Sequence, residues 1–360
     1  MSADAKILIS DFKKRLDPEI KAFFAEVKKS ADVKDPFIRE AIDHMEDIVV
    51  SGGKRLRAAL MYYSYLASGG TNREAILKAS VSVELIHAFL LVHDDIIDRD
   101  ALRHGVETLH TRYTKKARKY FPEKDEEHFG TSIALILGDM LYAFGNDVIF
   151  RADFPKEAIF RALSCLQKIV TCTVTGQARD IYIEFQGSAT EEEILSMYEN
   201  KTARYSIEGP LHLGALLAGG SQELLDLYSE YAIPLGIAYQ IQDDILGVFG
   251  EEKAIGKPVG SDIQEGKYTL LVAKAIELGT EEQRRRIKSL LSGSRALELT
   301  DIEDFRNLLK ETGSLETCRA IAGEATKKSL AMLPELKRHM TEEAFAFLQA
   351  LTGYLLERDV

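Results

Sequence analysis

Two apolar stretches of this chain each run directly into closely spaced aspartates. The first reads VELIHAFLLVHDDIIDRD (83–100) and the second reads YQIQDDILGVFG (239–250). On a helix, Asp94 and Asp98 lie one turn apart on the same face, where like charges repel each other by a few tenths of a kcal/mol. Apolar surroundings make an unpaired carboxylate still less favourable. We therefore expect positive charge near both motifs that the motifs themselves do not supply.

Composition and helix signals predict an all-α fold. Hydrophobic residues make up 46% of the 360 residues and only 8 residues are proline, and the abundant Leu, Ala, Glu and Lys favour helices. No Pro-, Gly- or Ser-rich linker divides the chain, so we expect one domain over residues 1–360. Helix starts are expected at Asp17-Pro18 and Asp35-Pro36, where a cap residue precedes a proline. Asn72 is expected to cap one long helix that ends near Asp98. Further helices are expected at 130–150, 155–183, 191–205, 207–219, 222–248, 267–279, 281–292, 301–311, 315–333 and 341–357, with an irregular polar loop at 250–267.

Charge, cysteine content and hydropathy bear on partners and location. The formal net charge of −11 argues against nucleic acid as a partner, because binding phosphates requires an excess of Lys and Arg. Three cysteines in so long a chain fit a reducing compartment, and the first residues lack the apolar core of a signal peptide. No apolar stretch approaches the roughly 20 residues that a membrane span needs. We therefore expect a cytoplasmic protein with no membrane span.

The aspartate motifs are candidates for a site that holds a hard cation. Mg²⁺ prefers oxygen ligands and is typically held by one or two carboxylates, with substrate phosphates completing its octahedron. For Asp94 and Asp98 alone, a solvated acidic helix end would be the more common explanation. The second pair, Asp243 and Asp244, changes that balance. Two such helix ends predict a cavity in which Mg²⁺ ions hold a diphosphate, whereas the alternative is two unrelated surface patches.

A basic segment, SGGKRLRAAL (51–60), is a candidate anion site. Lys54 and Arg57 stand at a helix start just after two glycines, and both basic side chains and helix N-termini favour anions. The segment is not a Walker A loop, because the spacing differs and no Ser or Thr follows the lysine. Lys257 and Lys267, in the later polar loop, also lack that pattern. Each segment by itself would usually be a solvated surface.

Five segments occur in the order and spacing of the trans-isoprenyl diphosphate synthases, the polyprenyl synthetase family. They are GGKRLR (52–57), LIHAFLLVHDDIIDRDALRHG (85–105), YENKTA (198–203), YQIQDDILG (239–247) and GKPVGSDIQEGKYTLL (256–271). The chain resembles most the archaeal and bacterial type of geranylgeranyl diphosphate synthase. The resemblance implies an isoprenoid synthase fold with helices around a large central cavity, usually in a homodimer. It also implies Mg²⁺-dependent condensation of isopentenyl diphosphate with an allylic diphosphate, with three Mg²⁺ ions around the bound diphosphate.

The resemblance also implies a role for each matching residue. Metal ligands are expected at Asp94, Asp95, Asp98, Asp243 and Asp244. The isopentenyl diphosphate site is expected at Lys54, Arg57 and His87. Around the allylic diphosphate, the matching positions are Arg103, Lys201, Thr202, Gln240, Lys257 and Lys267, of which Lys201, Thr202 and Gln240 are the candidate catalytic residues.

Three positions depart from the family pattern. Gly247 stands where the second aspartate motif usually ends in aspartate, and GVET (105–108) replaces the usual Gly-x-Pro-Thr. His104 stands where a second phosphate-binding arginine is usual. Histidine is mostly neutral above pH 7 and lacks the bidentate fork of arginine. We therefore expect weaker binding of isopentenyl diphosphate than an arginine would give.

Three other classes of protein remain as alternatives. A terpene cyclase or head-to-head prenyl synthase shares the fold, but it does not need the isopentenyl diphosphate site that GGKRLR indicates. A non-catalytic subunit tends to lose aspartates, which this chain keeps. A structural helical protein would have no reason to place paired aspartates at the ends of two apolar helices.

Product length is the least constrained expectation. The growing product must extend away from the metal site, so a bulky residue beside its path stops elongation. Phe89 lies five residues before Asp94, about 7.5 Å along a helix, and the smaller Leu90 lies four before it. In the family this pattern resembles synthases of geranylgeranyl diphosphate, with farnesyl or longer products as alternatives. Ordinary core packing of Phe89 is the competing interpretation, because a helical wheel offsets it from Asp94 by roughly 140°.

Overall fold

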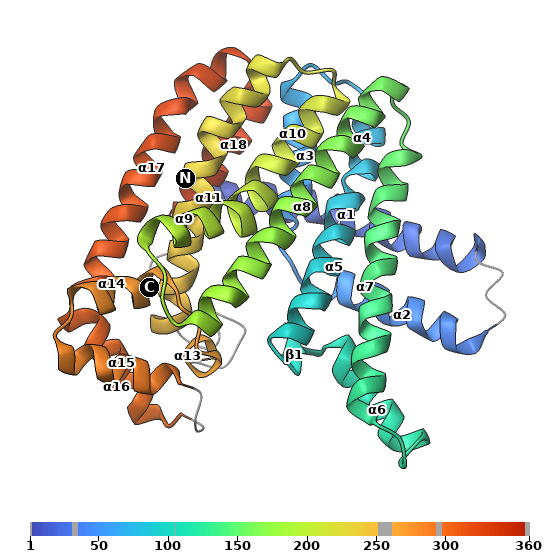
Figure 1. The fold of residues 1–360 in the computed structure, drawn as a ribbon. Coiled ribbons are helices and arrows are strands. Elements are labelled where there is room, and N and C mark those ends of the chain that lie inside the picture. Colours follow the sequence, from blue (N-terminus) through green and yellow to red (C-terminus); the bar gives the residue numbers. More distant parts are fainter. Residues whose placement is uncertain (1, 31–34, 104, 251–260, 293–296, 357–360) are drawn as a thin grey trace.

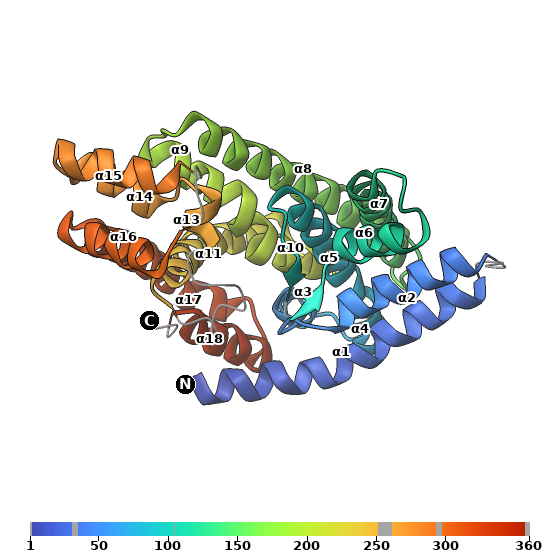
Figure 2. The same cartoon turned by 90° about the horizontal axis from the view of Figure 1, so that it is seen from below.

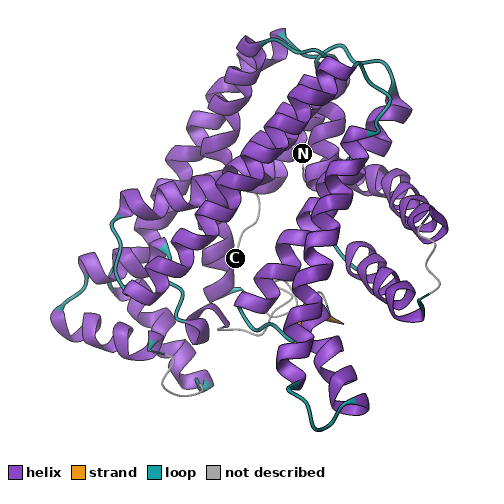
Figure 3. Cartoon of the chain, turned by 45° about the vertical axis from the view of Figure 1, so that its right-hand side comes forward, coloured by secondary structure: helices purple, strands orange, loops and turns teal. Residues whose placement is uncertain are grey.

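The structure is a computed structural model that describes residues 2–30, 35–103, 105–250, 261–292 and 297–356. Almost every described element is a helix (Figures 1 and 3). In chain order the elements are α1 (Ser2–Ser30), α2 (Pro36–Val50), α3 (Leu56–Ala67), α4 (Arg73–Ala79), α5 (Val81–Ile97), β1 (Leu102–Arg103), β2 (Val106–Glu107), α6 (Leu109–Tyr120), α7 (Glu126–Phe150), α8 (Lys156–Gln186), α9 (Glu191–Tyr198), the π-helix η1 (Glu199–Glu208), α10 (Gly209–Leu217), α11 (Gln222–Phe249), α13 (Ser261–Glu265), α14 (Leu270–Leu278), α15 (Glu281–Leu291), α16 (Leu299–Glu311), α17 (Ser314–Arg338) and α18 (Glu342–Leu356). The prediction of an all-α fold is confirmed.

Long helices position the site. α5, α8 and α11 run in the same direction, and their C-terminal ends gather at the lower side of Figure 1. α11 packs along α17 and α5 packs along α7. Seen from below, α1 spans one side of the molecule and α14 to α16 extend from the opposite end (Figure 2). Both aspartate motifs therefore end on the same side of the fold.

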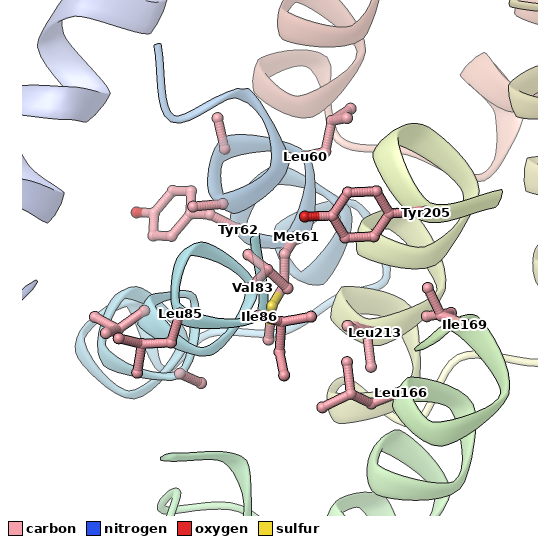
Figure 4. Packing of buried hydrophobic residues seen from close by; sticks show 14 of the residues in the cluster. Leu60, Met61, Tyr62, Val83, Leu85, Ile86, Leu166, Ile169, Tyr205 and Leu213 are labelled. Atoms are coloured by element: carbon pink, nitrogen blue, oxygen red, sulfur yellow. The ribbon is translucent and has the colours of Figure 1, made fainter. Parts of the chain in front are cut away.

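Two clusters of buried side chains hold this arrangement. The larger one involves α1 to α8, η1, α10, α11, the end of α17 and α18. The smaller one involves the end of α8, α9, the second half of α11 and α13 to α17. Figure 4 shows part of the larger cluster, where Val83 and Ile86 of α5 lie among side chains from α3, α8 and α10. The apolar residues that precede the first aspartate motif are therefore packed in the core.

Several helix predictions were confirmed and others were wrong. Asp35 caps α2 with Pro36 at its first position, and the Asn72 side chain accepts a hydrogen bond from the Ala75 amide. The start predicted at Asp17-Pro18 was wrong, because Pro18 lies inside α1. An internal proline costs about 3 kcal/mol, and the complete burial of the neighbouring Leu16 and Ile20 offsets that cost.

The predicted helix from Asn72 to Asp98 is broken in two, with Ser80 at the junction between α4 and α5. The two helices predicted at 191–205 and 207–219 are three elements, because the backbone adopts a π-helix over η1. The amide of Gly209 donates to the carbonyl of Arg204, five residues back, just before Pro210. The prediction also missed α6, and the loop expected at 250–267 contains the short helix α13.

Three helices or helix pairs are long and apolar enough to cross a membrane by length and composition. They span Arg73–Ile97, Glu126–Phe150 and Lys156–Gln186. The expectation that no stretch approaches that length was therefore wrong. In the first of them, 78% of the most apolar window is buried inside the protein, so its apolarity serves the core.

Candidate active site

The end of α5 presents Asp94 and Asp98 one turn apart, as their spacing predicts. Asp98 caps the helix, and its amide donates to the Asp94 carbonyl at 2.8 Å. The carboxylate of Asp94 accepts a hydrogen bond from Gln177 of α8 at 3.0 Å, and Asp98 pairs with Lys267 at 3.2 Å. Each carboxylate is thus already oriented by a residue from a distant part of the chain.

Asp95 is buried, with 2% of its surface exposed. Its carboxylate pairs with Nε of Arg103, whose Nη2 lies 3.7 Å from Asp94 and 3.4 Å from Asp100. Burial raises the pKa of Asp95 to about 6, although the adjacent Arg103 opposes that shift. The structure therefore places Asp95 as the main partner of Arg103. His104, the next residue, lies outside the described residues.

The second aspartate motif is held by hydrogen bonds from α9 and from the preceding turn of α11. Asp244 is buried and accepts hydrogen bonds from the hydroxyl of Tyr198 and from Gln240 at 2.8 Å, whereas Asp243 is exposed. Thr202 donates to the other end of the Gln240 amide at 2.6 Å. The predicted site residues Thr202, Gln240 and Asp244 thus form one hydrogen-bonded chain.

α8 and η1 lie between the two motifs; η1 carries the predicted Lys201 and Thr202, whereas α8 supplies Gln177 and Asp180, which the predictions missed. Lys201 of η1 pairs with Asp180 of α8 at 2.5 Å. Burial opposes the charged ammonium, yet Asp180 and Asp94 together raise the pKa of Lys201 above its usual value. The i, i+3, i+7 spacing of Gln177, Asp180 and Glu184 was a usable signal for one polar face on α8. Lys201 therefore stays protonated between the two aspartate motifs.

Two glycines allow η1 to sit close to its neighbours. A Cβ on Gly176 of α8 would lie 2.4 Å from the backbone nitrogen of Lys201. A Cβ on Gly236 of α11 would lie 2.4 Å from the Cα of Ala203. Both distances are shorter than real side chains tolerate, so these glycines set the position of Lys201 and Thr202. π-Helical turns occur frequently at functional sites.

The basic segment lies beside the first motif. Arg57 contacts His87 at 3.2 Å and Ser206 at 2.8 Å, and its guanidinium lies 4.6 Å from the centre of the Tyr205 ring. Lys54 donates to the hydroxyl of Tyr354 on α18 at 2.5 Å. A small pocket of about 30 Å³ is lined by residues that include Gly52, Gly53, His87 and Arg103. The structure therefore brings Arg57 and His87 into contact, as predicted. His87 and Arg103, which were assigned to different substrates, line the same small pocket. Lys257 lies outside the described residues.

The donor atoms at these helix ends suit a hard cation. Asp94 and Asp98 offer carboxylate oxygens one turn apart, and Gln177 adds a polar side chain. Within the described part of the chain, no group of three or more His, Cys, Asp or Glu side chains could hold a metal ion by itself. This pattern suits Mg²⁺, which often keeps few protein ligands and completes its shell with phosphate oxygens and water.

The predicted chain-length residue faces a neighbouring helix. The Phe89 ring lies 5.2 Å from the Tyr142 ring of α7 and 4.9 Å from the His93 ring, and Phe89 is 8% exposed. The Tyr142 hydroxyl donates to Gln167 of α8. Leu90 is half-buried against the core. Phe89 is therefore packed firmly between α5 and α7.

Comparison with known proteins decides the family. The family model for polyprenyl synthetase matches residues 38–309. This chain belongs to the polyprenyl synthetase family. It is 33% identical over 346 residues to a short chain isoprenyl diphosphate synthase of Methanothermobacter thermautotrophicus, covering 92% of this chain and 98% of that protein. It is also 33% identical over 327 residues to a geranylgeranyl diphosphate synthase of Sulfolobus acidocaldarius, covering 90% of this chain and 92% of the relative.

A solved structure supports the same assignment. The geranylgeranyl pyrophosphate synthase of Corynebacterium glutamicum, crystallised with isoprenyl diphosphate and magnesium, matches with a TM-score of 0.89 and 34% identity, covering 97% of this chain and 99% of that one. The polyprenyl synthetase described here therefore has the isoprenoid synthase fold and is a trans-prenyltransferase. Use of Mg²⁺ with diphosphate substrates follows from the family.

The close approach of η1 to α11 predicts a kinetic effect of Gly236→Ala. The added methyl group has to push Ala203 aside, which moves Lys201 and Thr202 and costs about 1–3 kcal/mol of stability. We expect a loss of roughly ten-fold or more in kcat, with the far-ultraviolet circular dichroism unchanged. Gly323→Ala on α17 is the matched control, because nothing lies within 4 Å of its added methyl group. Equal kcat values for the two variants would contradict this role of Gly236.

Proposed function

We propose that this polyprenyl synthetase condenses isopentenyl diphosphate with an allylic diphosphate and forms chiefly geranylgeranyl diphosphate. The observation that carries the proposal is the convergence of carboxylates and cations at the end of an apolar helix. Asp94 and Asp98 meet Gln177 and Lys267 there, with Lys201 nearby. The allylic primer is proposed to be dimethylallyl, geranyl or farnesyl diphosphate.

The first chemical step is loss of diphosphate from the allylic substrate. Mg²⁺, three ions in our proposal, would supply Lewis-acid neutralisation of the leaving diphosphate when bound with it. Lys201 and Lys267 add fixed positive charge, which is most effective when it is positioned before the reaction. The Thr202–Gln240–Asp244 chain orients the groups facing the diphosphate. The apolar face of α5 excludes water from the allylic cation.

The second step joins the two substrates. Arg57 and His87, in contact with each other, would bind the diphosphate of isopentenyl diphosphate, whose double bond attacks the cation. A proton then leaves the new carbon chain, and the released diphosphate is its acceptor in our proposal. We assign His87 to binding phosphate and not to acting as a base, because it lies in contact with Arg57 of the same proposed site.

The metal assignment predicts that Asp94→Ala and Asp98→Ala each lower kcat/KM by at least about a hundred-fold. Both residues stand at a helix end, but the Asp94 side chain is 27% exposed and that of Asp98 only 8%. The thermal midpoint should therefore change little for Asp94→Ala and fall more for Asp98→Ala. Activity measured with isopentenyl and farnesyl diphosphates should depend on added Mg²⁺ and vanish in chelator. Asp139→Ala on α7, an exposed aspartate outside the motifs, is the matched control. Near-normal turnover of either motif variant would overturn the assignment.

Product length is proposed from the position of Phe89. Its ring is held between α5 and Tyr142 of α7. Val83 and Ile86, which precede it on α5, are packed in the core (Figure 4). An isoprenoid tail that extends from the aspartate end along α5 reaches Phe89 before these residues. The relatives described above include short chain and geranylgeranyl synthases, which supports the same range of lengths.

Shortening Phe89 should lengthen the product. We expect Phe89→Leu to give some chains beyond twenty carbons and Phe89→Ala to give more, because each substitution removes atoms from the stop. Products from farnesyl diphosphate and excess isopentenyl diphosphate are separated by reversed-phase chromatography. Phe305→Leu removes a similarly buried ring from α16 and controls for general destabilisation. An unchanged product would remove Phe89 from this role, and a fifteen- or thirty-carbon wild-type product would overturn the assigned length.

A homodimer is also proposed, supported by the surface of α7 and α8. These two helices carry exposed large apolar side chains, namely Leu135, Ile136, Phe150, Phe160, Val174, Tyr182 and Phe185. Exposed apolar patches of this kind mark interaction sites, and a symmetric dimer would cover the same patch on both copies. The three free cysteines support the proposal of a cytoplasmic location.

The dimer proposal predicts that Ile136→Glu combined with Val174→Glu produces monomers. Two charges per copy, placed on an apolar face, would be buried without partners on association. Size-exclusion chromatography with light scattering should show half the wild-type mass. Leu299→Glu, at an 81% exposed position on α16, should keep the wild-type mass. A dimer of unchanged stability in the double variant would place the interface elsewhere.

A further inference from the structure

Arg55 has an unusual backbone conformation and an unusual environment. It is one of two non-glycine residues with positive φ among the described residues, at φ 60°, and it stands at the start of α3. The left-handed region costs a side-chain-bearing residue roughly 1–2 kcal/mol. The Arg55 side chain is also 3% exposed, although a buried guanidinium is costly unless it is well paired. Such a residue persists only where the surroundings hold it.

Two carboxylates from other helices pair with two of the three side-chain nitrogens of Arg55, and among the described residues the third, Nη2, has no hydrogen-bond partner. The Nε of Arg55 donates to Asp17 of α1 at 2.9 Å, and its Nη1 donates to Glu84 of α5 at 3.1 Å. The second oxygen of Glu84 accepts the amide of Ala58, in the first turn of α3, at 3.4 Å. Glu84, itself 4% exposed, therefore binds both the side chain and the backbone at the start of α3.

This ion cluster lies beside the residues proposed to bind isopentenyl diphosphate. Glu84 and His87 are three residues apart on α5, and they contact Arg55 and Arg57 respectively. The start of α3 is thus attached to α5 at two points about one helical turn apart. The cluster of Arg55, Asp17 and Glu84 has a formal charge of −1, so it does not by itself attract a diphosphate. Its role must come from geometry.

We propose that Arg55 and Glu84 are positioning residues for isopentenyl diphosphate. Their ion pair, anchored on α1 by Asp17, fixes the first turn of α3 against α5. The left-handed turn directs Arg55 into the interior, and it thereby determines where the adjacent Lys54 and Arg57 present their charges. This inference rests on the proposed function of Lys54, Arg57 and His87.

The first test is Glu84→Gln, which keeps the shape of the side chain and removes its charge. If the ion pair positions α3, the KM for isopentenyl diphosphate should rise about ten-fold. The KM for farnesyl diphosphate and the kcat at saturating isopentenyl diphosphate should stay within about two-fold. If Arg55 instead bound the diphosphate directly, removing the competing carboxylate would lower this KM. A lower or unchanged KM therefore overturns the proposal.

The second test separates the Arg55 side chain from its backbone. Glycine adopts positive φ without cost, so Arg55→Gly keeps the turn and loses the ion pair. We expect Arg55→Gly to raise the KM for isopentenyl diphosphate as Glu84→Gln does, and Arg55→Lys to raise it less, because lysine keeps the charge without the fork. A wild-type KM for Arg55→Gly would show that the backbone alone sets the turn, and it would overturn the role of the ion pair.

Two controls complete the experiment. Lys28→Gln removes another ion pair that attaches α1, to Glu46 of α2 at 2.6 Å, and should lower the thermal midpoint slightly without a selective change in KM. If Glu84→Gln lowers the activity toward both substrates in proportion to the loss of folded protein, the role of Glu84 is only structural and the proposal fails.

Arg57→Gln tests the proposed isopentenyl diphosphate site itself. If Arg57→Gln leaves the KM for isopentenyl diphosphate unchanged, the site assignment fails. If Arg57→Gln raises this KM but Glu84→Gln and Arg55→Gly do not, the positioning proposal fails and the site assignment stands.

Discussion

Repulsion between the carboxylates at the ends of α5 and α11 is the constraint on which the rest of the site depends. The chain balances it with cations that come from elsewhere, since Lys267 pairs with Asp98 and Lys201 pairs with Asp180 beside Asp94. Asp180 and Asp94 raise the pKa of Lys201 above its usual value, so its ammonium remains charged. A complex of Mg²⁺ with a multiply charged anion suits the same site. The metal ions would face the carboxylates, and the anion would face the lysines.

Bringing those cations into place requires close packing of helix backbones. η1 can approach α8 and α11 only because Gly176 and Gly236 have no side chain, and its π-helical turn places Lys201 and Thr202 toward opposite partners, Asp180 and Gln240. On the other side of α5, the buried Arg55–Glu84 pair holds the start of α3. The charged side chains of the candidate site are therefore positioned by contacts between backbones and by buried ion pairs.

Much of the fold and site could be predicted from local patterns. Helix content, the Asp35 and Asn72 caps, and the shared face of Asp94 and Asp98 depend on residues close in sequence, so spacing sufficed. The helix predictions failed where packing against distant parts of the chain outweighed the local sequence preference. Pro18 stays inside α1 because its neighbours are buried, and η1 forms where α8 and α11 press on it. Gln177, Asp180 and Tyr198 were missed because the predictions followed closely spaced aspartates and basic segments, whereas these residues stand singly on α8 and α9.

Sequence alone was enough to place the two aspartate motifs on helices and to put Asp94 and Asp98 on one face, because helical periodicity is a local property. Only the tertiary structure decided how adjacent residues differ in burial and in their partners. Asp95 follows Asp94 directly, yet it is buried against Arg103 with a raised pKa, while Asp94 faces Gln177. Phe89 likewise meets Tyr142 of α7, a contact that spacing along α5 could not specify. Burial and long-range pairing depend on which helices meet, and that information is distributed over the whole chain.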